Sequence, residues 1–196
     1  MADTGIEAGL IQRCVQGDET AWRWLIGQYR ERLFRVAMGL LGHPSEAEEA
    51  TQETFVQVFR HLAGFQGGSS LYTWACRICI NLCLRRRERV RRTQQREVSL
   101  DSDEGIKRAA VVPGTPTPED ALLEEELSSH LHQALRRLPI EFQAALVLRE
   151  IDGLSYEEIA QALGVSLGTV KSRVHRGRLI LKERVKEYLE GAAYAS

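Results

Sequence analysis

The chain has 196 residues, enough for one large domain or two small ones, and its formal net charge of −1 does not by itself indicate a nucleic-acid-binding protein. It shows no apolar N-terminal signal segment and no apolar run that could span a bilayer, so we expect a cytoplasmic protein without membrane insertion, whose four cysteines are reduced. The charges are nevertheless segregated. Six arginines and one glutamate fall between residues 85 and 92, whereas acidic residues concentrate at 46–53 and 119–126. This segregation predicts separate basic and acidic surfaces.

The first part of the chain has the apolar periodicity of helices. A short helix is expected over residues 5–13, and Asp18 is a plausible N-cap for the next helix, which ends at the helix-breaking residues 42–44. A further helix is predicted to begin at Ser45, because Ser45 and Glu48 have the spacing of a capping box. Its apolar face is expected to comprise Phe55, Val58, Phe59 and Leu62. Its exposed face is expected to comprise Glu46, Glu49, Gln52, Glu53 and Gln57.

A glycine-rich loop at residues 64–70, which carries Phe65, precedes a helix that is expected from Leu71 to about Arg92. The first half of this helix is apolar almost all round, except for a polar stripe at four-residue spacing. The polar stripe comprises Thr73, Arg77, Asn81, Arg85 and Arg89. Such a stripe is costly unless it faces solvent or a polar partner. With the neighbouring aromatic residue it suits single-stranded nucleic acid, although an ordinary solvated face is the simpler alternative.

The pattern then changes to a polar, proline-containing stretch without apolar periodicity, which predicts a flexible linker over residues 93–118. Beyond it, one helix is expected to contain Leu127, Leu131, Leu135 and Leu138 and to stop at Pro139. The next helix is expected to contain Phe142, Leu146 and Leu148. No strand pattern of convincing length occurs anywhere. We therefore predict an all-α fold of two small helical domains, residues 8–92 and 119–190, joined by the linker.

The last helical pair has the pattern of a helix-turn-helix. Ser155 is a suitable N-cap, Gly164 permits a sharp turn, and Ala160 and Val170 supply the small and apolar residues that pack where the two helices cross. The second helix carries basic residues on its outer side: Lys171, Arg173, Arg176, Arg178, Lys182, Arg184 and Lys186. We expect its N-terminal half to lie in a DNA major groove. The alternative is an amphipathic hairpin with a solvated basic face.

The cysteines Cys76, Cys79 and Cys83 would lie along one side of the helix that begins at Leu71. A regular helix presents such thiols in a line, whereas zinc requires a tetrahedron, and Cys14 is remote. We expect them to be packing residues, and a redox role, a metal-sensing role and a disulfide remain as alternatives. The histidines show no ligand spacing. We therefore predict no metal site and no cofactor.

Four segments together carry a resemblance to a known family. The segments LREIDGLSYEEIA, at 148–160, and GTVKSRVHRGR, at 168–178, resemble region 4 of bacterial extracytoplasmic-function (ECF) sigma factors, which belong to the sigma-70 family. SEAEEATQETFVQVF, at 45–59, resembles region 2.2, and SSLYTWACRICIN, at 69–81, resembles region 2.3. The resemblance implies that residues 8–92 are region 2 and that residues 119–190 are region 4.

The resemblance also implies partners and sites. Region 2 would bind the clamp of the RNA polymerase core through Glu49, Gln52, Glu53 and Phe55. It would read and melt the minus-10 element, on the non-template strand, through Phe65, Ser70, Arg77, Asn81 and Arg85. Region 4 would contact the polymerase flap and read the minus-35 duplex through Arg149, Lys171, Ser172, Arg173, His175 and Arg176. An anti-sigma factor that covers both regions is a further expected partner.

Three function classes follow from these observations. The first is an alternative sigma factor without catalysis of its own. The second is a conventional helix-turn-helix regulator that binds duplex DNA alone, against which the polar stripe and the acidic helix argue. The third is an enzyme, and the sequence offers no nucleophile with a base, no phosphate-binding glycine loop and no paired carboxylates in a credible pocket. We therefore expect a sigma factor and no enzyme.

Overall fold

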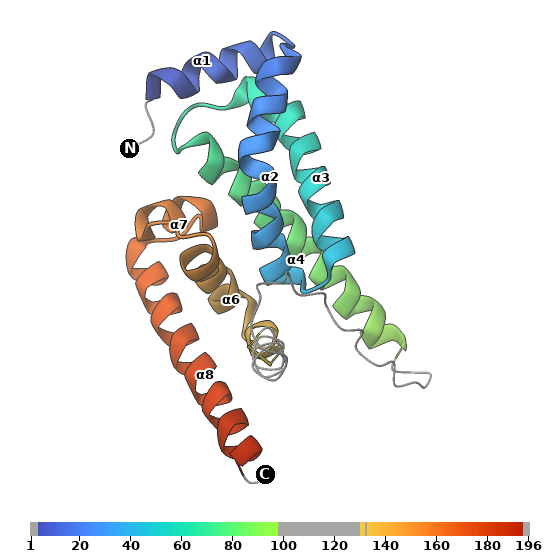
Figure 1. Ribbon diagram of the computed structural model, residues 1–196, viewed down its shortest axis with the longest axis vertical. Helices are drawn as coiled ribbons and strands as arrows, with labels where there is room; N and C mark the ends of the chain where they lie inside the picture. The colour runs from blue at the N-terminus through green and yellow to red at the C-terminus, as the bar shows by residue number, and fades with distance from the viewer. Residues whose placement is uncertain (1–3, 98–129, 132, 194–196) are drawn as a thin grey trace, which may run out of the picture.

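The computed structural model describes residues 4–97, 130, 131 and 133–193, and every regular element in this part of the chain is helical (Figure 1). The N-terminal unit contains α1 (Thr4–Val15), α2 (Glu19–Leu41), α3 (Pro44–His61), the short η1 (Leu62–Gly64) and α4 (Leu71–Glu97). The C-terminal unit contains α6 (Ile140–Leu146), η2 (Val147–Ile151), α7 (Tyr156–Leu163) and α8 (Leu167–Ala193). The predicted all-α fold is confirmed.

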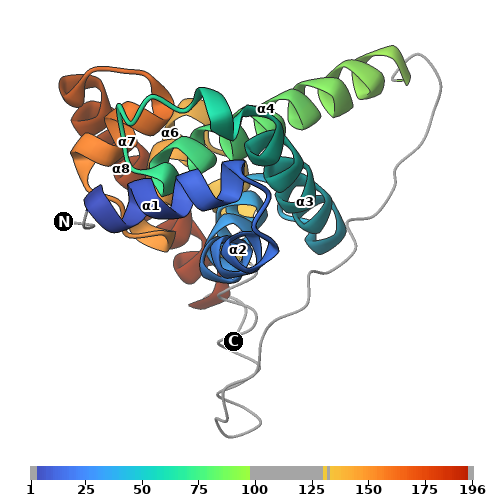
Figure 2. The ribbon, with the colours of Figure 1, turned by 90° about the horizontal axis from the view of Figure 1, so that it is seen from above.

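Helices α2, α3 and α4 pack against one another as a bundle, and α1 crosses one end of it (Figure 1). Leu33, Val36 and Cys79 lie in the bundle core and are fully buried. A smaller cluster, which includes Leu25 and Leu62, seals the end beneath α1. Figure 2 shows that the last turns of α4 project beyond the bundle. The N-terminal unit therefore presents one long, partly uncovered helix.

The start of α2 agrees with the sequence, whereas the start of α3 does not. The Asp18 side chain accepts hydrogen bonds from the N–H groups of Thr20 (2.8 Å) and Ala21 (3.2 Å), so it is the predicted N-cap. The prediction that Ser45 and Glu48 form a capping box is wrong, since α3 already begins at Pro44. Proline is favoured in the first helical turn because its fixed φ suits the helix and its missing N–H is not needed there.

The apolar face of α3 also differs from the prediction at one residue. Val58 and Leu62 are buried and Phe55 is half-buried, as expected, but the Phe59 side chain is 64% exposed. Its ring lies against that of Trp22, with a centroid distance of 5.1 Å. The helical period alone cannot distinguish the centre of an apolar face from its edge, where a large side chain lies at the rim of the core.

Two side chains hold the beginning of α4. The Ser70 hydroxyl accepts a hydrogen bond from the N–H of Thr73 at 3.1 Å, and the carboxylate of Glu7 in α1 accepts one from the N–H of Leu71 at 2.8 Å. A negative charge at this end also opposes the helix dipole. Helix α4 ends at Glu97, five residues beyond the expected end at Arg92. The rest of the predicted linker, with Leu127, lies outside the described residues.

The C-terminal unit contains the predicted helix-turn-helix in α7 and α8. Ser155 and Glu158 form a reciprocal capping box, and Gly164 ends α7 with a φ of +65°. Ser166 caps α8, accepting from the N–H of Thr169 at 3.1 Å. The polypeptide before α7 is α6 followed by a short π-helical segment, η2, instead of one regular helix. The caps therefore set both ends of the turn that separates the two helices.

We expect Ser155→Ala to lower the free energy of unfolding of the C-terminal unit by about 1 kcal/mol, because the variant removes the side-chain acceptor of the cap. Urea denaturation followed by circular dichroism measures this difference. Ser69→Ala is the control, since the Ser69 hydroxyl donates only to a neighbouring carbonyl, that of Ser70. Equal midpoints for both variants would contradict the role of the cap.

The two units share one hydrophobic core. A single cluster of buried residues joins Leu33, Val36 and Cys79 of the N-terminal unit to Val147, Leu148 and Ile159 of the C-terminal unit. Helix α4 packs on α7, and α2 packs on η2. The sequence predicted two separate domains, and the structure adds that they are packed against each other through apolar surface.

Candidate nucleic-acid interface

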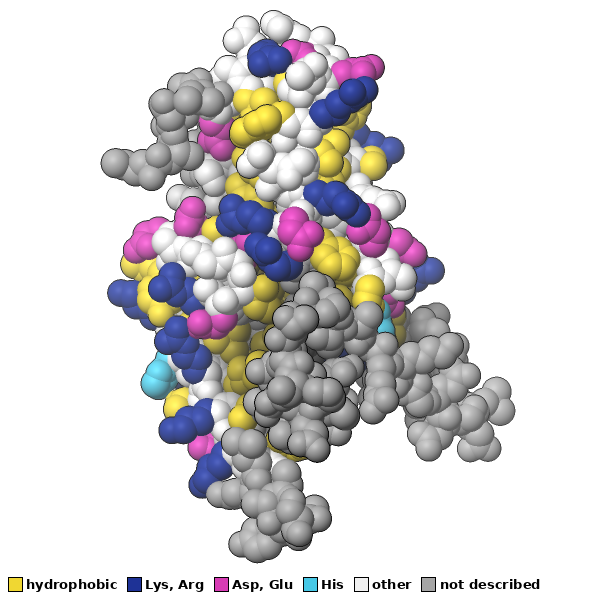
Figure 3. Space-filling model, viewed as in Figure 1, with side chains coloured by type: hydrophobic (Ala, Val, Ile, Leu, Met, Phe, Trp, Pro, Cys, Tyr) yellow, Lys and Arg dark blue, Asp and Glu magenta, His cyan; other side chains and the backbone are white. Residues whose placement is uncertain are grey.

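The first half of α8 has an inner apolar side and an outer polar side. Val170 and Val174 are at most 1% exposed and anchor the helix to the core. The outer residues in this half are exposed: Lys171, Ser172, His175 and Arg176. Figure 3 shows Lys and Arg side chains following the outer edge of α8. The N-terminal half of α8 therefore presents the hydrogen-bond donors of its side chains to solvent. A recognition helix uses such donors to contact base edges and phosphates.

Two predicted minus-35 residues do not lie on this outer face. The Arg149 guanidinium donates to the carbonyl oxygen of Leu154 at 2.8 Å and lies over the ring of Tyr156, so it supports the loop before α7. Arg173 is half-buried and lines a cavity of about 260 Å³ together with Asn81. In this structure the exposed face therefore comprises four of the six predicted residues.

The predicted minus-10 residues divide between exposed and structural positions. Arg77, Asn81 and Arg85 are exposed along α4, as the polar stripe predicted. Ser70 is the cap of that helix. The Phe65 ring packs against Trp74, with a centroid distance of 5.2 Å. Three exposed residues thus follow one another at four-residue spacing on the same helix.

The polar stripe does not reach solvent along its whole length. Thr73 is buried, and its hydroxyl lies 2.8 Å from the Ser70 hydroxyl, so it belongs to the cap of α4. Arg77 lies beside the turn of the helix-turn-helix, since a Cβ atom at Gly164 would meet its guanidinium at 3.5 Å. The exposed part of the stripe therefore begins at Arg77, next to the C-terminal unit.

The predicted polymerase-binding residues lie on α3, and two of them are ion-paired within the chain. The carboxylates of Glu49 and Glu53 each lie 2.9 Å from a guanidinium nitrogen of Arg86 in α4. The hydrogen bond that Arg86 donates to Glu53 is the largest cause that raises the pKa of Arg86. Gln52 is exposed, and Phe55 is half-buried against the core. A basic partner would therefore have to compete with Arg86 for the two carboxylates.

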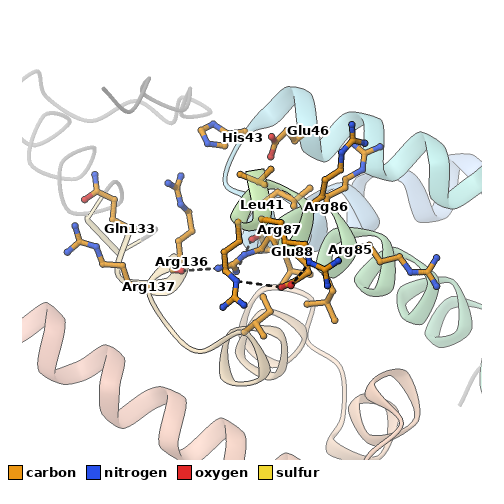
Figure 4. A pocket seen from close by; sticks show the side chains of 17 residues that line it. Leu41, His43, Glu46, Arg85, Arg86, Arg87, Glu88, Gln133, Arg136 and Arg137 are labelled. Carbon is orange, nitrogen blue, oxygen red and sulfur yellow. Dashed lines mark hydrogen bonds and ion pairs between the residues drawn. The ribbon is translucent and has the colours of Figure 1, made fainter. Parts of the chain in front are cut away.

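A second basic feature lies between the two units. The arginine groove, with a volume of about 1340 Å³, is lined by eight arginines and two glutamates among other residues. The arginines are Arg85, Arg86, Arg87, Arg89, Arg91, Arg92, Arg136 and Arg137. Figure 4 shows Arg85–Arg87 approaching from α4 and Arg136 and Arg137 from the segment before α6. Burial and the charge of Arg136 lower the pKa of Arg87.

The contact between the units is centred on Asp152, which the sequence did not identify as a functional residue. Its side chain is fully buried and lies against the N-terminal unit. The Tyr72 hydroxyl lies 2.8 Å from both carboxylate oxygens, and Nε of Arg32 donates to Oδ1 at 3.0 Å. Burial raises the pKa of Asp152, whereas Tyr72 and Arg32 oppose this shift. Because 120 residues separate Arg32 from Asp152, no local pattern could have predicted the pair.

Gln143 forms a second polar contact between the units. This side chain is fully buried, and its Nε2 donates to the carbonyl oxygen of Gly39 at 2.7 Å. Its Oε1 accepts a hydrogen bond from Arg87. Gly39 lies in the last turns of α2, where carbonyl groups lack partners within the helix. Gln143 thus supplies a hydrogen-bond donor to a carbonyl group at the end of α2, which belongs to the N-terminal unit.

The cysteines are buried and free, as expected for packing residues. Cys76, Cys79 and Cys83 are fully buried in α4, and burial raises the pKa of the Cys76 thiol. In the described ranges no group of three or more His, Cys, Asp or Glu side chains could hold a metal ion. Nor is any described helix long and apolar enough to cross a membrane. Thiol reactivity requires a thiolate, which burial disfavours at Cys76.

Comparisons with known proteins agree with the helical architecture and with the order of its parts. Residues 25–93 match the family described as "Sigma-70 region 2", and residues 129–181 match "Sigma-70, region 4". The chain is 41% identical over 186 residues to "ECF RNA polymerase sigma factor SigE" of Mycolicibacterium smegmatis, covering 92% of this chain and 68% of the relative. It is 32% identical over 184 residues to "RNA polymerase sigma-H factor" of Pseudomonas aeruginosa, covering 93% and 95%.

Two solved structures share the fold. The sigma factor RpoE in complex with the anti-sigma factor NepR from Bartonella quintana has a TM-score of 0.67 at 24% identity, covering 84% of this chain and 96% of that one. CnrH in complex with the cytosolic domain of CnrY has a TM-score of 0.66 at 22% identity, covering 92% and 97%. At these identities the two structures show the fold alone.

The fold and the two family matches define a helical DNA-reading protein of the sigma-70 class. Within that class, the chain belongs to the ECF RNA polymerase sigma factors. It is therefore an alternative sigma factor, a transcription initiation factor that directs core RNA polymerase to promoters.

Proposed function

We propose that the outer face of α8 reads the minus-35 element as duplex DNA. The observation that carries this assignment is the exposed basic half-helix directly after the capped turn, where Val170 and Val174 anchor the helix to the core. Lys171, His175 and Arg176 extend from it. Arginine and lysine can donate to purine N7 and O6 or neutralise phosphates. Arg149 supports the loop before α7, and Arg173 joins the outer face only when it leaves the cavity beside Asn81.

The exposed part of the polar stripe on α4 is the proposed site for the melted minus-10 strand. Arg77 and Arg85 would follow the phosphates, and Asn81 would hydrogen-bond the edge of a base that has left the stack. Phe65 lies in the loop that precedes the same helix, and its ring packs on Trp74 in the first turn of α4. The Ser70 cap fixes the point at which this loop enters the helix. Region 2 then extends from about residue 8 to the exposed turns of α4.

The acidic face of α3 is the proposed contact for the polymerase clamp. Glu49 and Glu53 are partly exposed and bind Arg86 within the chain. A basic clamp surface would replace Arg86, while Gln52 and Phe55 supply hydrogen bonds and apolar contact at the same face. Region 4 would contact the flap. The protein would act in the cytoplasm and would have no catalytic activity of its own.

An anti-sigma factor is the proposed regulator. RpoE and CnrH, which share this fold, were solved in complex with NepR and with the cytosolic domain of CnrY. A partner of this kind would bind both units of the present chain and keep it from polymerase. A pull-down from cells under repressing conditions tests this point. Recovery of polymerase subunits alone would count against a regulator of this kind.

Transcription in vitro on a library of promoter fragments, with core polymerase and with or without the protein, tests the proposed function. We expect discrete transcripts only with the protein, and we expect Asn81→Ala to reduce them about tenfold, because a base contact contributes about 1–3 kcal/mol. Gln28→Ala, an exposed change on α2, is the control. A footprint on duplex DNA by the protein alone, without redirected core polymerase, would favour a conventional regulator.

A further inference from the structure

The arginine groove lies beside a second, smaller space, the cavity of about 260 Å³ that contains Asn81 and is called the Asn81 cavity below. Leu84 and Ile140 line both spaces, so the two are adjacent. One part of this combined site is strongly basic, and the other is mainly apolar with a few polar residues in its walls. A small ligand that is anionic at one end and has a ring at the other matches both parts.

The positive charge of the arginine groove exceeds that of the acidic side chains described around it. Glu88 pairs with Arg91 and Arg92, and Arg86 pairs with two glutamates of α3. Glu46 is the other acidic residue in the lining. Four further arginines of the groove form no ion pair with any described carboxylate: Arg85, Arg87, Arg136 and Arg137. Guanidinium groups gathered in this way favour the binding of an anion.

Arg87 shows this imbalance most clearly. Its half-buried guanidinium donates to Oε1 of Gln143 and, at 3.4 Å, to the carbonyl oxygens of Leu40 and Arg136 (Figure 4). In the described part of the chain all of these acceptors are uncharged. Burial of a charge is costly unless an opposite charge accompanies it, and burial together with Arg136 lowers the pKa of Arg87. A phosphate group in the groove would supply the missing negative charge.

The end of α2 holds Arg136 in the groove. A Cβ atom at Gly42 would lie 2.7 Å from Nη1 and 3.0 Å from Nε of Arg136, so the arginine side chain lies directly on the backbone of this glycine. Gly42 has a φ of +77°, a conformation that favours glycine. Arg87 and Arg136 are therefore held beside each other before a ligand arrives. Such preorganisation lowers the entropic cost of binding.

The Asn81 cavity has the size and the lining for a single ring system. Its volume lies just below the range of pockets that hold drug-sized ligands. Apolar side chains that can cover the faces of a ring form much of its wall: Ile80, Leu84, Ile140, Ala144, Ala162 and Leu163. Its polar residues, which can bind the edge of a ring, are Arg77, Asn81, Glu141 and Arg173. A nucleobase has such apolar faces and such a polar edge.

We propose that the arginine groove and the Asn81 cavity together bind a guanine nucleotide that carries at least two phosphates. The Glu141 carboxylate can accept two hydrogen bonds from the adjacent N1–H and N2–H groups of guanine, whereas adenine offers it only the N6 amino group. The Asn81 amide can both donate to the base and accept from it. The phosphates would bind Arg87 and Arg136, since arginine forms strong, bidentate contacts with phosphate.

Isothermal titration calorimetry with the full chain, in buffer without divalent cations, tests this site. The probes are GTP, ATP, GMP and inorganic tripolyphosphate. We expect GTP to bind about tenfold more tightly than ATP, because the contact with Glu141 discriminates between the two bases. GMP should bind at least tenfold more weakly than GTP, because it lacks the additional phosphates. Tripolyphosphate should bind through the arginine groove alone.

Two variants separate the two parts of the site. Arg136→Gln removes a charge but keeps the carbonyl oxygen that Arg87 contacts, so we expect about tenfold weaker binding of both GTP and tripolyphosphate. Glu141→Gln should weaken GTP binding about tenfold without weakening that of tripolyphosphate, because glutamine retains only one acceptor oxygen.

Each variant has a matched control. Arg23→Gln removes an exposed arginine of α2 that pairs with Glu19, far from the groove in the chain. Glu157→Gln removes an acidic residue from the first turn of α7, as Glu141→Gln does from the first turn of α6. We expect both controls to bind GTP as wild type does. Circular dichroism verifies that all four variants are folded.

Three results would overturn the proposal. The first is the absence of GTP binding, or GTP binding that Arg136→Gln leaves unchanged. The second is equal affinity for GTP and tripolyphosphate with no effect of Glu141→Gln, which would show that the Asn81 cavity holds no base. The third is a short single-stranded oligonucleotide that loses as much affinity as GTP in Arg136→Gln, which would assign the groove to nucleic acid.

The nucleotide site also has a consequence that rests on the proposed function. Asn81 is the residue assigned to the minus-10 base, so the nucleotide and that base would exclude each other there. We expect saturating GTP to weaken the binding of a minus-10 single strand at least threefold in wild type, and not in Glu141→Gln at the same GTP concentration. The calorimetric result needs no polymerase. A failure of the chain to direct transcription would therefore contradict the proposed function and leave the nucleotide site standing.

Discussion

Replacing Arg176 by alanine should reduce transcription from minus-35-dependent promoters at least tenfold while leaving the fold unchanged. Arg176 is exposed in the N-terminal half of α8, one turn beyond the exposed Ser172 and two residues beyond the buried Val174 that anchors the helix. A bidentate contact from arginine to a guanine contributes about 1–3 kcal/mol and discriminates against other bases. Run-off transcription with core polymerase measures the loss, and single-base changes in the minus-35 element show which position loses its discrimination.

Lys182→Ala is the matched control for Arg176→Ala. Lys182 is also basic and exposed, but it lies almost two turns further along α8, beyond the half that would enter the major groove. We expect a decrease of less than about threefold for Lys182→Ala, and the same discrimination among bases as in wild type. Equal losses for the two variants would show that the whole basic side acts only through its charge, which contradicts base reading by the first half of α8.

Replacing Gly177 by valine should destabilise the C-terminal unit by about 2–3 kcal/mol, because extra methyl groups in a packed core force neighbouring side chains and backbone to shift. Gly177 is buried where α8 crosses α6. A Cβ atom at this position would lie 2.9 Å and 3.0 Å from two carbons of Leu146 and 3.4 Å from Phe142. Leu146 is itself fully buried, so it has no space into which to move. Urea denaturation measures the change.

Gly168→Val is the control on the same helix. A Cβ atom at Gly168 meets only the Ser166 hydroxyl, at an ordinary distance of 3.8 Å. We expect this variant to stay within about 0.5 kcal/mol of wild type, as exposed substitutions do. A Gly177→Val variant as stable as the control would show that α6 and α8 can separate without cost. The position of the outer face of α8 would then not depend on this contact.

Local signals in the sequence predicted most of the helix-turn-helix. Ser155 and Gly164 lie at the ends of α7 as expected, and Val170 is buried on the inner side of α8. Each feature depends on residues within one or two turns: a cap requires a side-chain oxygen beside free N–H groups, and a left-handed turn favours glycine. The start of α3 was mispredicted because two local signals competed there, and Pro44 prevailed over Ser45.

The candidate site was only partly predictable, because exposure depends on neighbours that are distant in sequence. Arg77, Asn81 and Arg85 are exposed, as their spacing indicated, while Thr73 of the same polar stripe is buried beneath the cap of α4. Arg173 has the sequence context of the outer face, yet it turns toward α4. A helical period gives the direction of a side chain, and only the packing of a second element decides whether that direction leads to solvent.

The sequence by itself determined the helical class, the order of the two units, the ends of the helix-turn-helix and the family. These features follow from short-range chemistry: helical period, capping and turn conformation. The tertiary structure alone decided that the units close on each other, with Asp152 between Arg32 and Tyr72 and with Gly39 against Val147. Those contacts join residues about a hundred positions apart, and their stability comes from burial and from donors that converge on one carboxylate. No spacing along the chain encodes such an arrangement.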